Sequence, residues 1–265
     1  MSRLAAIAHK VSGVPGAVGA LAADRLPVRG RGAAVLCYHD IGTDPSNRTD
    51  YYLGPDLFRA HLEWIHAWGL TVVPLAEIVD RHAGGRDLDG LVAITFDDAL
   101  HGVLEHAAPI LEEQHAPATV FVVTDVVGID PPFWPGAART LGPAELQELC
   151  ASGLVKLGSH TATHASLPDV PPDVRTRELS DSRAWLEDLT GTDVDLFAYP
   201  FGHHDAPSEA DTVTAGYRAA CTFTFGRVTA SRPATAIPRF CIGPMHDKFR
   251  LARQLARAAG AWPTD

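Results

Sequence analysis

The chain of 265 residues has a mass of 28.3 kDa, a hydrophobic content of 46% and a mean hydropathy near zero, which excludes disorder, collagen and coiled coil. Its formal net charge of −10 and its scattered Lys and Arg residues argue against nucleic acid as a partner. No apolar run reaches the length of a membrane span, and nothing in the sequence indicates an oligomeric state.

The first part of the chain differs in composition from the rest. Arg3 and Lys10 precede a stretch of small residues at 11–23, which is interrupted by Gly and Pro. This weak apolar core favours an N-terminal arm over residues 1–32, with a signal peptide as the alternative. We expect a single domain over residues 33–265.

The four cysteines are widely spaced and form no CxxC motif. Cys37 and Cys221 fall in apolar runs, where a thiol packs as a small hydrophobic side chain. We therefore interpret all four cysteines as reduced. Reduced thiols favour a cytoplasmic location, with secretion or the cell envelope as the alternative.

From residue 33 onward, short β-rich runs alternate with longer amphipathic runs. Seven near-continuous apolar runs are typical of strands buried on both faces, at 33–38, 70–73, 91–96, 118–123, 154–157, 195–199 and 219–225. Helical periodicity is clearest at 55–68 and 174–189, and glycine follows each of these segments. The pattern predicts an α/β fold of repeated βα units around a parallel sheet or barrel.

Unusual polar residues follow these strands. His39 comes after the first run, Asp97 and Asp98 after the third, and His160 and His164 after the fifth. Because the carboxyl ends of parallel strands face one rim, we expect these residues to converge there. Two imidazoles and one carboxylate are the ligand set of a catalytic zinc site with an open position.

The pair of adjacent aspartates suggests a division of labour. Successive side chains leaving a strand point to different sides, so one Asp can bind a metal while the other accepts a proton from water. Such a site hydrolyses amides or esters. The alternatives are that Asp97-Asp98 caps a helix and that His160 is a structural histidine.

Three motifs resemble those of the polysaccharide deacetylases of the NodB homology type, carbohydrate esterase family 4. Thr95-Phe96-Asp97-Asp98 resembles the first family motif, Gly158-Ser159-His160-Thr161-Ala162-Thr163-His164 the second and Tyr199-Pro200-Phe201-Gly202 the third. Their order and spacing also fit. Weaker similarities extend the resemblance over about residues 33–260, and Tyr38-His39 is similar to the poly-N-acetylglucosamine deacetylase branch.

The resemblance implies a distorted (β/α)7 barrel, related to the TIM barrel, and metal-dependent removal of an acetyl group from an N-acetylated sugar. Asp97 would be the general base. The metal ligands would be Asp98, His160 and His164, holding zinc or, with the same ligands, cobalt, manganese or nickel. Backbone N–H groups near Tyr199 and Phe201 would form part of the oxyanion pocket.

The chain departs from the family pattern at three places. Ala198 stands where the third motif usually has Arg, and Arg239, after a late run, is a candidate to orient the base instead. Ala99 replaces a usual Gly. The late acid motif is reduced to His246 in a Gly-Pro-flanked loop, so we prefer His39, at a strand end, as the general acid, with His246 as the alternative.

One aromatic residue stands out among the loops. Trp134 lies in a long Pro-rich loop after the fourth strand, where it either stacks on a sugar ring or anchors the loop. His203 and His204 fit a solvated loop better than a substrate contact.

The leading hypothesis is a hydrolase of an acetamido sugar. Two alternatives stay open: an esterase or another amide hydrolase on the same scaffold, and a carbohydrate-binding protein that has lost catalysis. Retention of the base and all three ligand residues argues against the second.

Overall fold

The computed structural model describes residues 31–44 and 49–257. The N-terminal arm, with its signal-peptide alternative, was predicted over residues 1–32. Residues 1–30 of this arm lie outside the described residues. A parallel sheet in the order β10-β1-β5-β6-β7-β8-β9 forms the centre, and β4 pairs with β5 beside this path. The strands of this sheet are β1 Ala34–Tyr38, β4 Thr71–Val72, β5 Leu91–Phe96, β6 Ala118–Val122, β7 Val155–Ser159, β8 Leu196–Ala198, β9 Ala219–Cys221 and β10 Phe240–Cys241.

The sheet curls and closes through one segment of the chain. Ile237 pairs with β9 through Ile237 N–H to Ala220 O at 2.8 Å, and Arg239 N–H donates to Thr224 O at 3.1 Å. The next two residues form β10, in which Phe240 lies opposite Leu36 of β1. The expected distorted barrel is therefore confirmed, and residues 237–241 join its two edges.

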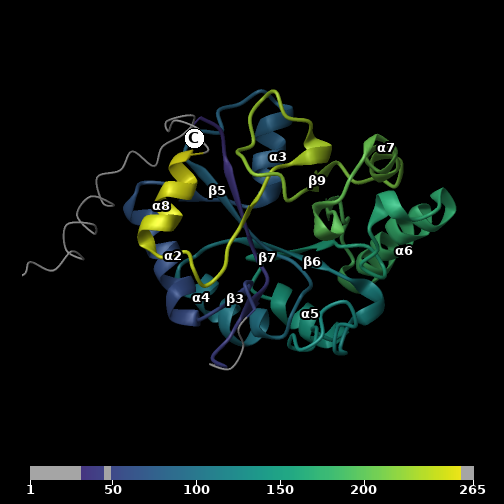
Figure 1. The fold of residues 1–265 in the computed structure, drawn as a ribbon, viewed down its shortest axis with the longest axis horizontal. Helices are drawn as coiled ribbons and strands as arrows, with labels where there is room; N and C mark the ends of the chain where they lie inside the picture. Colours follow the sequence, from purple (N-terminus) through teal and green to yellow (C-terminus); the bar gives the residue numbers. More distant parts are fainter. Residues whose placement is uncertain (1–30, 45–48, 258–265) are drawn as a thin grey trace, which may run out of the picture.

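Helices surround this sheet on the outside, as Figure 1 shows. They are α2 Pro55–Ala67, α3 Leu75–Ala83, α4 Ala108–Glu113, α5 Pro143–Cys150, α6 Pro172–Thr190, α7 Ala206–Thr214 and α8 Lys248–Arg257. The starts of α2, α5 and α6 follow from Pro in the first turn, where a missing N–H costs nothing. Gly191 ends α6 at a φ of 66°, which glycine adopts without strain.

Side chains of the strands alternate between two apolar clusters. In β1, Val35 joins Ala93 and Phe121 in the smaller cluster, whereas Leu36 joins the larger one that the helices cover. This alternation follows from the twofold side-chain period of a strand. The same alternation points every second side chain of a strand toward the inside of the barrel. A polar residue that continues the alternation just beyond the strand also points inside.

The sequence pattern predicts most of the observed strands but not all of them. The runs at 33–38, 91–96 and 118–123 correspond to β1, β5 and β6, whereas the run at 219–225 yields only the three residues of β9. The sequence missed β10 and the small pair β2 Asp40–Ile41 and β3 Tyr52–Leu53. Strands of two residues are too short to give a periodic signal.

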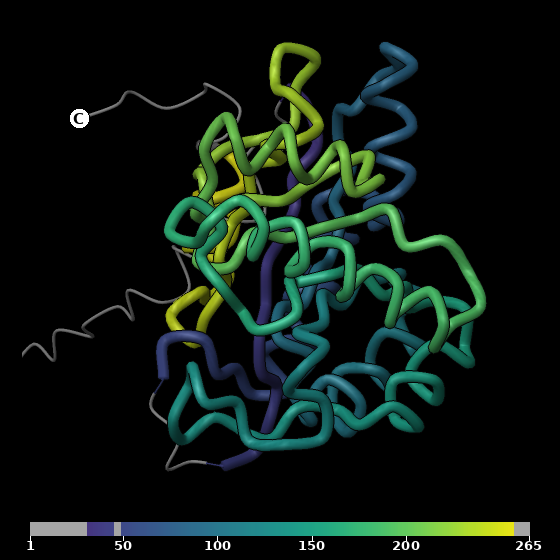
Figure 2. The backbone as a smooth tube through the Cα atoms, turned by 90° about the vertical axis from the view of Figure 1, so that its right-hand side faces the viewer, coloured from purple at the N-terminus to yellow at the C-terminus, as the bar shows by residue number. Residues whose placement is uncertain are grey.

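The loops that follow the strands gather at one end of the barrel. In Figure 2, the purple chain beyond β1 and the teal loop near residue 130 lie together at the lower end. Two ring contacts support this view, because Tyr51 and His39 lie 5.8 and 5.7 Å from the ring of Trp134. Among the described helices, none is both long and apolar enough to cross a bilayer.

Candidate active site

Five polar side chains are buried at the carboxyl ends of the central strands. They are His39 after β1, Asp97 and Asp98 after β5, and His160 and His164 after β7. The most exposed of them, His164, has only 9% of its surface accessible. Because parallel strands present their carboxyl ends on one rim, these residues meet although they are distant in the sequence.

Asp98, His160 and His164 form the first group. One donor atom of each lies within 4.8 Å of the other two. Nε2 of His164 is 3.5 Å and Nε2 of His160 is 3.8 Å from Oδ1 of Asp98. That carboxylate oxygen is buried and has no hydrogen-bond partner among the described residues. Two imidazole nitrogens and a carboxylate oxygen facing one point fit a divalent cation.

The backbone around these ligands is held in unusual conformations. Asp98 has a φ of 68° and His164 a φ of 67°. Residues with side chains enter this left-handed region only where the surrounding structure imposes it, and such residues concentrate at functional sites. The local conformation aims both side chains at the shared point.

Burial sets the protonation of this group. It lowers the pKa of His164 to about 2 and lowers the pKa of His160, so both imidazoles are neutral and keep a lone pair. Burial and the negative charge of Asp97 raise the pKa of Asp98 well above its usual range. A cation would offset this negative charge, so the donor set suits a metal.

Asp97 faces a different partner. The guanidinium of Arg239 donates to both of its carboxylate oxygens at 2.7 Å, and both side chains are fully buried. Burial alone would raise the pKa of Asp97, but Arg239 and then His160 lower it below its usual range. The carboxylate is therefore ionised, and its Oδ2 lies 3.9 Å from Nε2 of His160. The structure thus places Arg239 on Asp97, while Ala198 stands at the position of the family's usual Arg.

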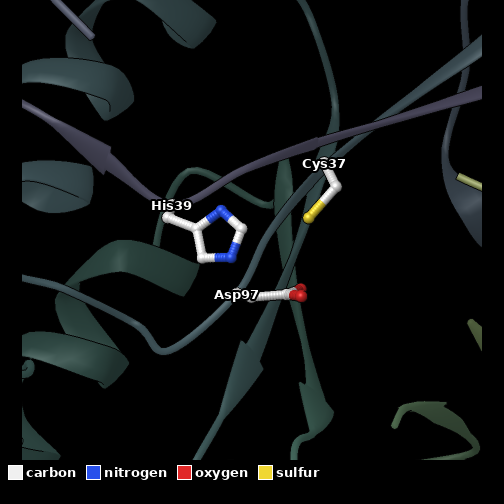
Figure 3. A group of neighbouring side chains, drawn as sticks. All are labelled: Cys37, His39 and Asp97. Carbon is white, nitrogen blue, oxygen red and sulfur yellow. The ribbon is translucent and has the colours of Figure 1, made fainter. Parts of the chain in front are cut away.

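Cys37, His39 and Asp97 form a second group with donor atoms within 4.8 Å of one another. Figure 3 shows these side chains converging from β1 and from the end of β5. Both oxygens of Asp97 already accept hydrogen bonds from Arg239. The group around Asp98 is therefore better suited to a cation than this one.

A cavity of about 300 Å³ opens over the rim. Its walls combine the metal-ligating candidates and His39 with aromatic side chains and a short polar segment; they are His39, Thr49, Asp50, Tyr51, Asp98, Phe133, Trp134, His160, His164, Phe201 and Phe223. A concave, mostly apolar site with a few convergent polar groups is typical of a small-molecule or sugar site.

His39 lies in the wall of this cavity. Its ring centroid is 4.6 Å from that of Tyr51 and 5.7 Å from that of Trp134. Its Nδ1 is buried and has no hydrogen-bond partner in the described part of the chain. Burial lowers the pKa of His39 to about 4.

The structure does not bring His246 to this cavity. Its Nε2 bonds to Oε1 of Gln254 in α8 at 2.6 Å, and its Nδ1 accepts from the N–H of Gly243 at 3.0 Å. It lines a separate depression beside Phe225 and Met245. Both ring nitrogens of His246 have protein partners, so of the two candidate acid residues only His39 lines the cavity.

The residues expected around the acyl group lie in different places. Trp134 and Phe201 line the cavity, and Phe201 has a φ of 57°. Tyr199 does not reach it: the side chain is fully buried, and its N–H donates to Cys221 O at 3.0 Å. Pro200 has no N–H. Phe201, the next residue, is therefore the remaining candidate of this segment for an oxyanion donor.

Sequence reasoning missed several residues of the site. Tyr51 and Phe223 line the cavity although neither was a candidate, and Phe133 lines it beside the candidate Trp134. Phe223 falls within the predicted run at 219–225 and Tyr51 lies outside the predicted strands. Glu178 of α6, on the other side of the loop between His160 and His164, also contributes to the site by holding this loop. Its carboxylate accepts from Ala162 N–H and Thr163 N–H at 2.9 Å each, within the loop between His160 and His164.

The chain is similar to known proteins over most of its length. The family model for polysaccharide deacetylase matches residues 84–220. YxkH of Bacillus subtilis, named as a candidate polysaccharide deacetylase, is 23% identical over 211 residues, 79% of this chain and 71% of that protein. The poly-β-1,6-N-acetyl-D-glucosamine N-deacetylase of Staphylococcus epidermidis is 24% identical over 161 residues, 58% of this chain. The chain spans 55% of that relative's length.

Solved structures share the barrel. The deacetylase PplD of Streptococcus pyogenes matches with a TM-score of 0.75 at 24% identity, over 85% of this chain and 99% of that chain. IcaB of Ammonifex degensii matches with a TM-score of 0.72 at 26% identity, over 86% and 98% of the two chains.

Proposed function

Because the chain belongs to the polysaccharide deacetylase family, we propose that it hydrolyses the N-acetyl group of an acetamido sugar, using Asp97 as general base and zinc held by Asp98, His160 and His164. Carbohydrate deacetylases are hydrolases of carbon–nitrogen bonds other than peptide bonds. The proposal is carried by one juxtaposition: Oδ2 of the ionised Asp97 lies 3.9 Å from a ligand nitrogen of His160.

Zinc is proposed because of the donor set. Neutral imidazoles and a carboxylate are the ligands of catalytic zinc sites, and cobalt, manganese or nickel bind the same atoms. When bound, the metal would lower the pKa of a water molecule and offset the negative charge that develops on the acetyl oxygen.

Asp97 is placed to accept the proton of the attacking water. Its two hydrogen bonds from Arg239 keep it ionised and fix the orientation of the carboxylate. His39 lies on the cavity wall and is the proposed general acid; because burial favours its neutral ring, it must first take up a proton, which it then passes to the departing amine. The N–H of Phe201 is the proposed second donor to the oxyanion.

The aromatic wall supports a sugar as the substrate. Tyr51, Trp134, Phe201 and Phe223 line the cavity, and aromatic faces pack against the apolar faces of sugar rings. The staphylococcal relatives act on poly-β-1,6-N-acetyl-D-glucosamine by name. We infer that this chain also acts on an N-acetylglucosamine-type glycan or glycoconjugate.

The test is metal-dependent release of acetate. The protein is freed of metal with a chelator and assayed on N-acetylglucosamine oligomers, small acetamido glycosides and acetylated xylan, before and after addition of zinc or cobalt. We expect acetate from an acetamido substrate only after metal is added. Release from xylan alone would replace the proposal with an esterase.

Two matched variants separate catalysis from binding. D97N should abolish acetate release while it keeps one equivalent of zinc, because Asp97 is bound to Arg239 rather than to the metal. D98N should lose the zinc itself. A wild-type protein that binds sugar and releases no acetate with zinc bound would instead be a carbohydrate-binding protein.

A further inference from the structure

The two candidate ligand histidines are held by different means. Nδ1 of His160 donates to the backbone oxygen of Ala198 at 2.7 Å, which fixes the ring and leaves Nε2 free toward Asp98. Such a hydrogen bond is the usual way to orient a ligand imidazole. Nδ1 of His164 is also buried but has no hydrogen-bond partner among the described residues.

Aromatic rings contact His164 instead. The ring of Phe133 stacks on its imidazole with centroids 3.9 Å apart and planes inclined by 18°. The ring of Phe201 approaches in an edge arrangement at 4.6 Å and 72°. The stacked contact restricts rotation of the imidazole out of its plane, which is the motion that would carry Nε2 away from Asp98.

The loop that carries Phe133 is tied to the backbone beside a second ligand. Gly128 N–H donates to Leu141 O at 3.1 Å, which closes the loop, and Leu141 N–H donates to Ala99 O at 2.8 Å. Ala99 directly follows Asp98. Arg139, near the end of the same loop, makes two hydrogen bonds to Glu145 of α5, at 2.6 and 2.7 Å. The loop that carries Phe133 is therefore tied at its ends to the backbone that directly follows Asp98.

We propose that Phe133 is a positioning residue of the metal site, whose stacked ring holds the imidazole of His164 in the orientation that a hydrogen bond provides for His160. This inference rests on the metal site of the proposed function. The ring also lies in the cavity wall, so it packs beside a bound substrate without being one of the reacting groups.

The test is the affinity for zinc, measured by competition with a chromogenic chelator. Loss of an orienting contact to a ligand typically lowers metal affinity by about 10-fold to 100-fold. We expect F133A and F133L to lower zinc affinity by about 10-fold or more, and F133Y, which keeps the ring, to stay within about threefold of the wild type. The visible spectrum of the cobalt form should change in F133A and F133L and be retained in F133Y.

W134A is the matched control, because Trp134 lies in the same loop and contacts His39 and Tyr51 rather than a ligand. Its zinc affinity should equal that of the wild type. The proposal would be overturned if F133L bound zinc as tightly as the wild type, or if W134A lost as much affinity as F133L. A wild-type protein without zinc affinity would instead refute the metal site of the proposed function.

Discussion

The guanidinium of Arg239 spans the inside of the barrel and donates two parallel hydrogen bonds to the carboxylate of Asp97, 142 positions earlier in the chain. A third and a fourth bond, to Thr95 Oγ1 and Thr222 O at 3.2 Å each, fix the guanidinium itself. Arg239 belongs to the segment that joins β9 to β1. Closure of the barrel and orientation of the proposed base therefore depend on the same few residues.

The first prediction concerns this pair. R239K keeps the charge but cannot make two parallel bonds to one carboxylate. We expect kcat/KM for deacetylation to fall by about 100-fold, with zinc stoichiometry unchanged, since Arg239 contacts no ligand side chain directly. Steady-state kinetics and metal analysis check both parts.

The double variant D97N/R239K provides the control for that interpretation. If Arg239 acts through Asp97, its replacement should add little to the loss caused by D97N alone. Independent, multiplying losses, or an R239K enzyme with wild-type activity, would contradict the role given to this pair.

The placement of the central site residues could be predicted because it depends on topology. Asp97, Asp98 and His160 directly follow buried strands, and parallel strands bring their carboxyl ends to one rim whatever the loops do. The same rule placed His39 at the rim. His164, four residues beyond His160, is brought back to the site by left-handed backbone that the sequence pattern does not reveal.

Other parts of the site depend on long-range packing that has no local signal. Phe133 and Tyr51 reach the cavity from loops whose paths are set by distant hydrogen bonds. Tyr199 and His246 have plausible sequence positions, yet the Tyr199 N–H bonds to Cys221 O and the His246 ring bonds to Gln254, away from the cavity. The N-terminal arm and the cytoplasmic location stay predictions.

The second prediction concerns Glu178, which is buried beside the loop that carries His160 and His164, the proposed ligand histidines. Besides two N–H groups, its carboxylate accepts from Thr163 Oγ1 at 2.7 Å. E178A leaves the buried N–H of Ala162 without its partner, which costs about 1–3 kcal/mol, whereas the donors of the exposed Thr163 can bond to water instead. We expect a lower free energy of unfolding in urea and weaker zinc binding, whereas E178Q should retain most of both.

Glu187, on the same helix, supplies the comparison. It accepts from Val194 N–H at 3.1 Å, away from the metal-ligating candidates. E187A should lower stability and leave zinc affinity unchanged. Equal zinc affinity in E178A and E187A would show that Glu178 supports the fold without shaping the site.

The third prediction concerns the glycine of the second motif. A Cβ at Gly158 would lie 2.6 Å from two ring atoms of Phe121 and 2.9 Å from Leu196 O. Phe121 is fully buried and cannot move away freely. We expect G158A to lower the free energy of unfolding by about 1–3 kcal/mol, the usual range for overpacking.

G54A is the control for that measurement, because no atom lies within 4 Å of a Cβ at Gly54. Gly54 is the N-cap of α2, where alanine is less favourable than glycine, so G54A should cost about 0.5–1 kcal/mol through the cap alone and without a clash. A G158A protein as stable as G54A would mean that the barrel interior yields to the added methyl group.

The last prediction concerns pH and a histidine away from the metal site. His61 is fully buried in α2; its Nδ1 accepts from the hydroxyl of Tyr38 at 3.1 Å and its Nε2 donates to the carbonyl of His246 at 2.6 Å. Burial lowers the pKa of His61 from 6.5 to about 4, so the folded protein holds the neutral ring. Below pH 6.5 the unfolded chain therefore binds a proton that the folded chain excludes.

Neutral His61 therefore makes its full contribution to the free energy of unfolding above pH 6.5. This contribution is lost progressively as the pH falls toward 4, by up to about 3 kcal/mol. H61Q offers the same acceptor and donor without a titrating group. In urea unfolding with chelator present, the stability advantage of the wild type over H61Q should shrink between pH 7.5 and pH 4.5. Parallel pH profiles for the two proteins would show that His61 is charged when folded or exposed to solvent.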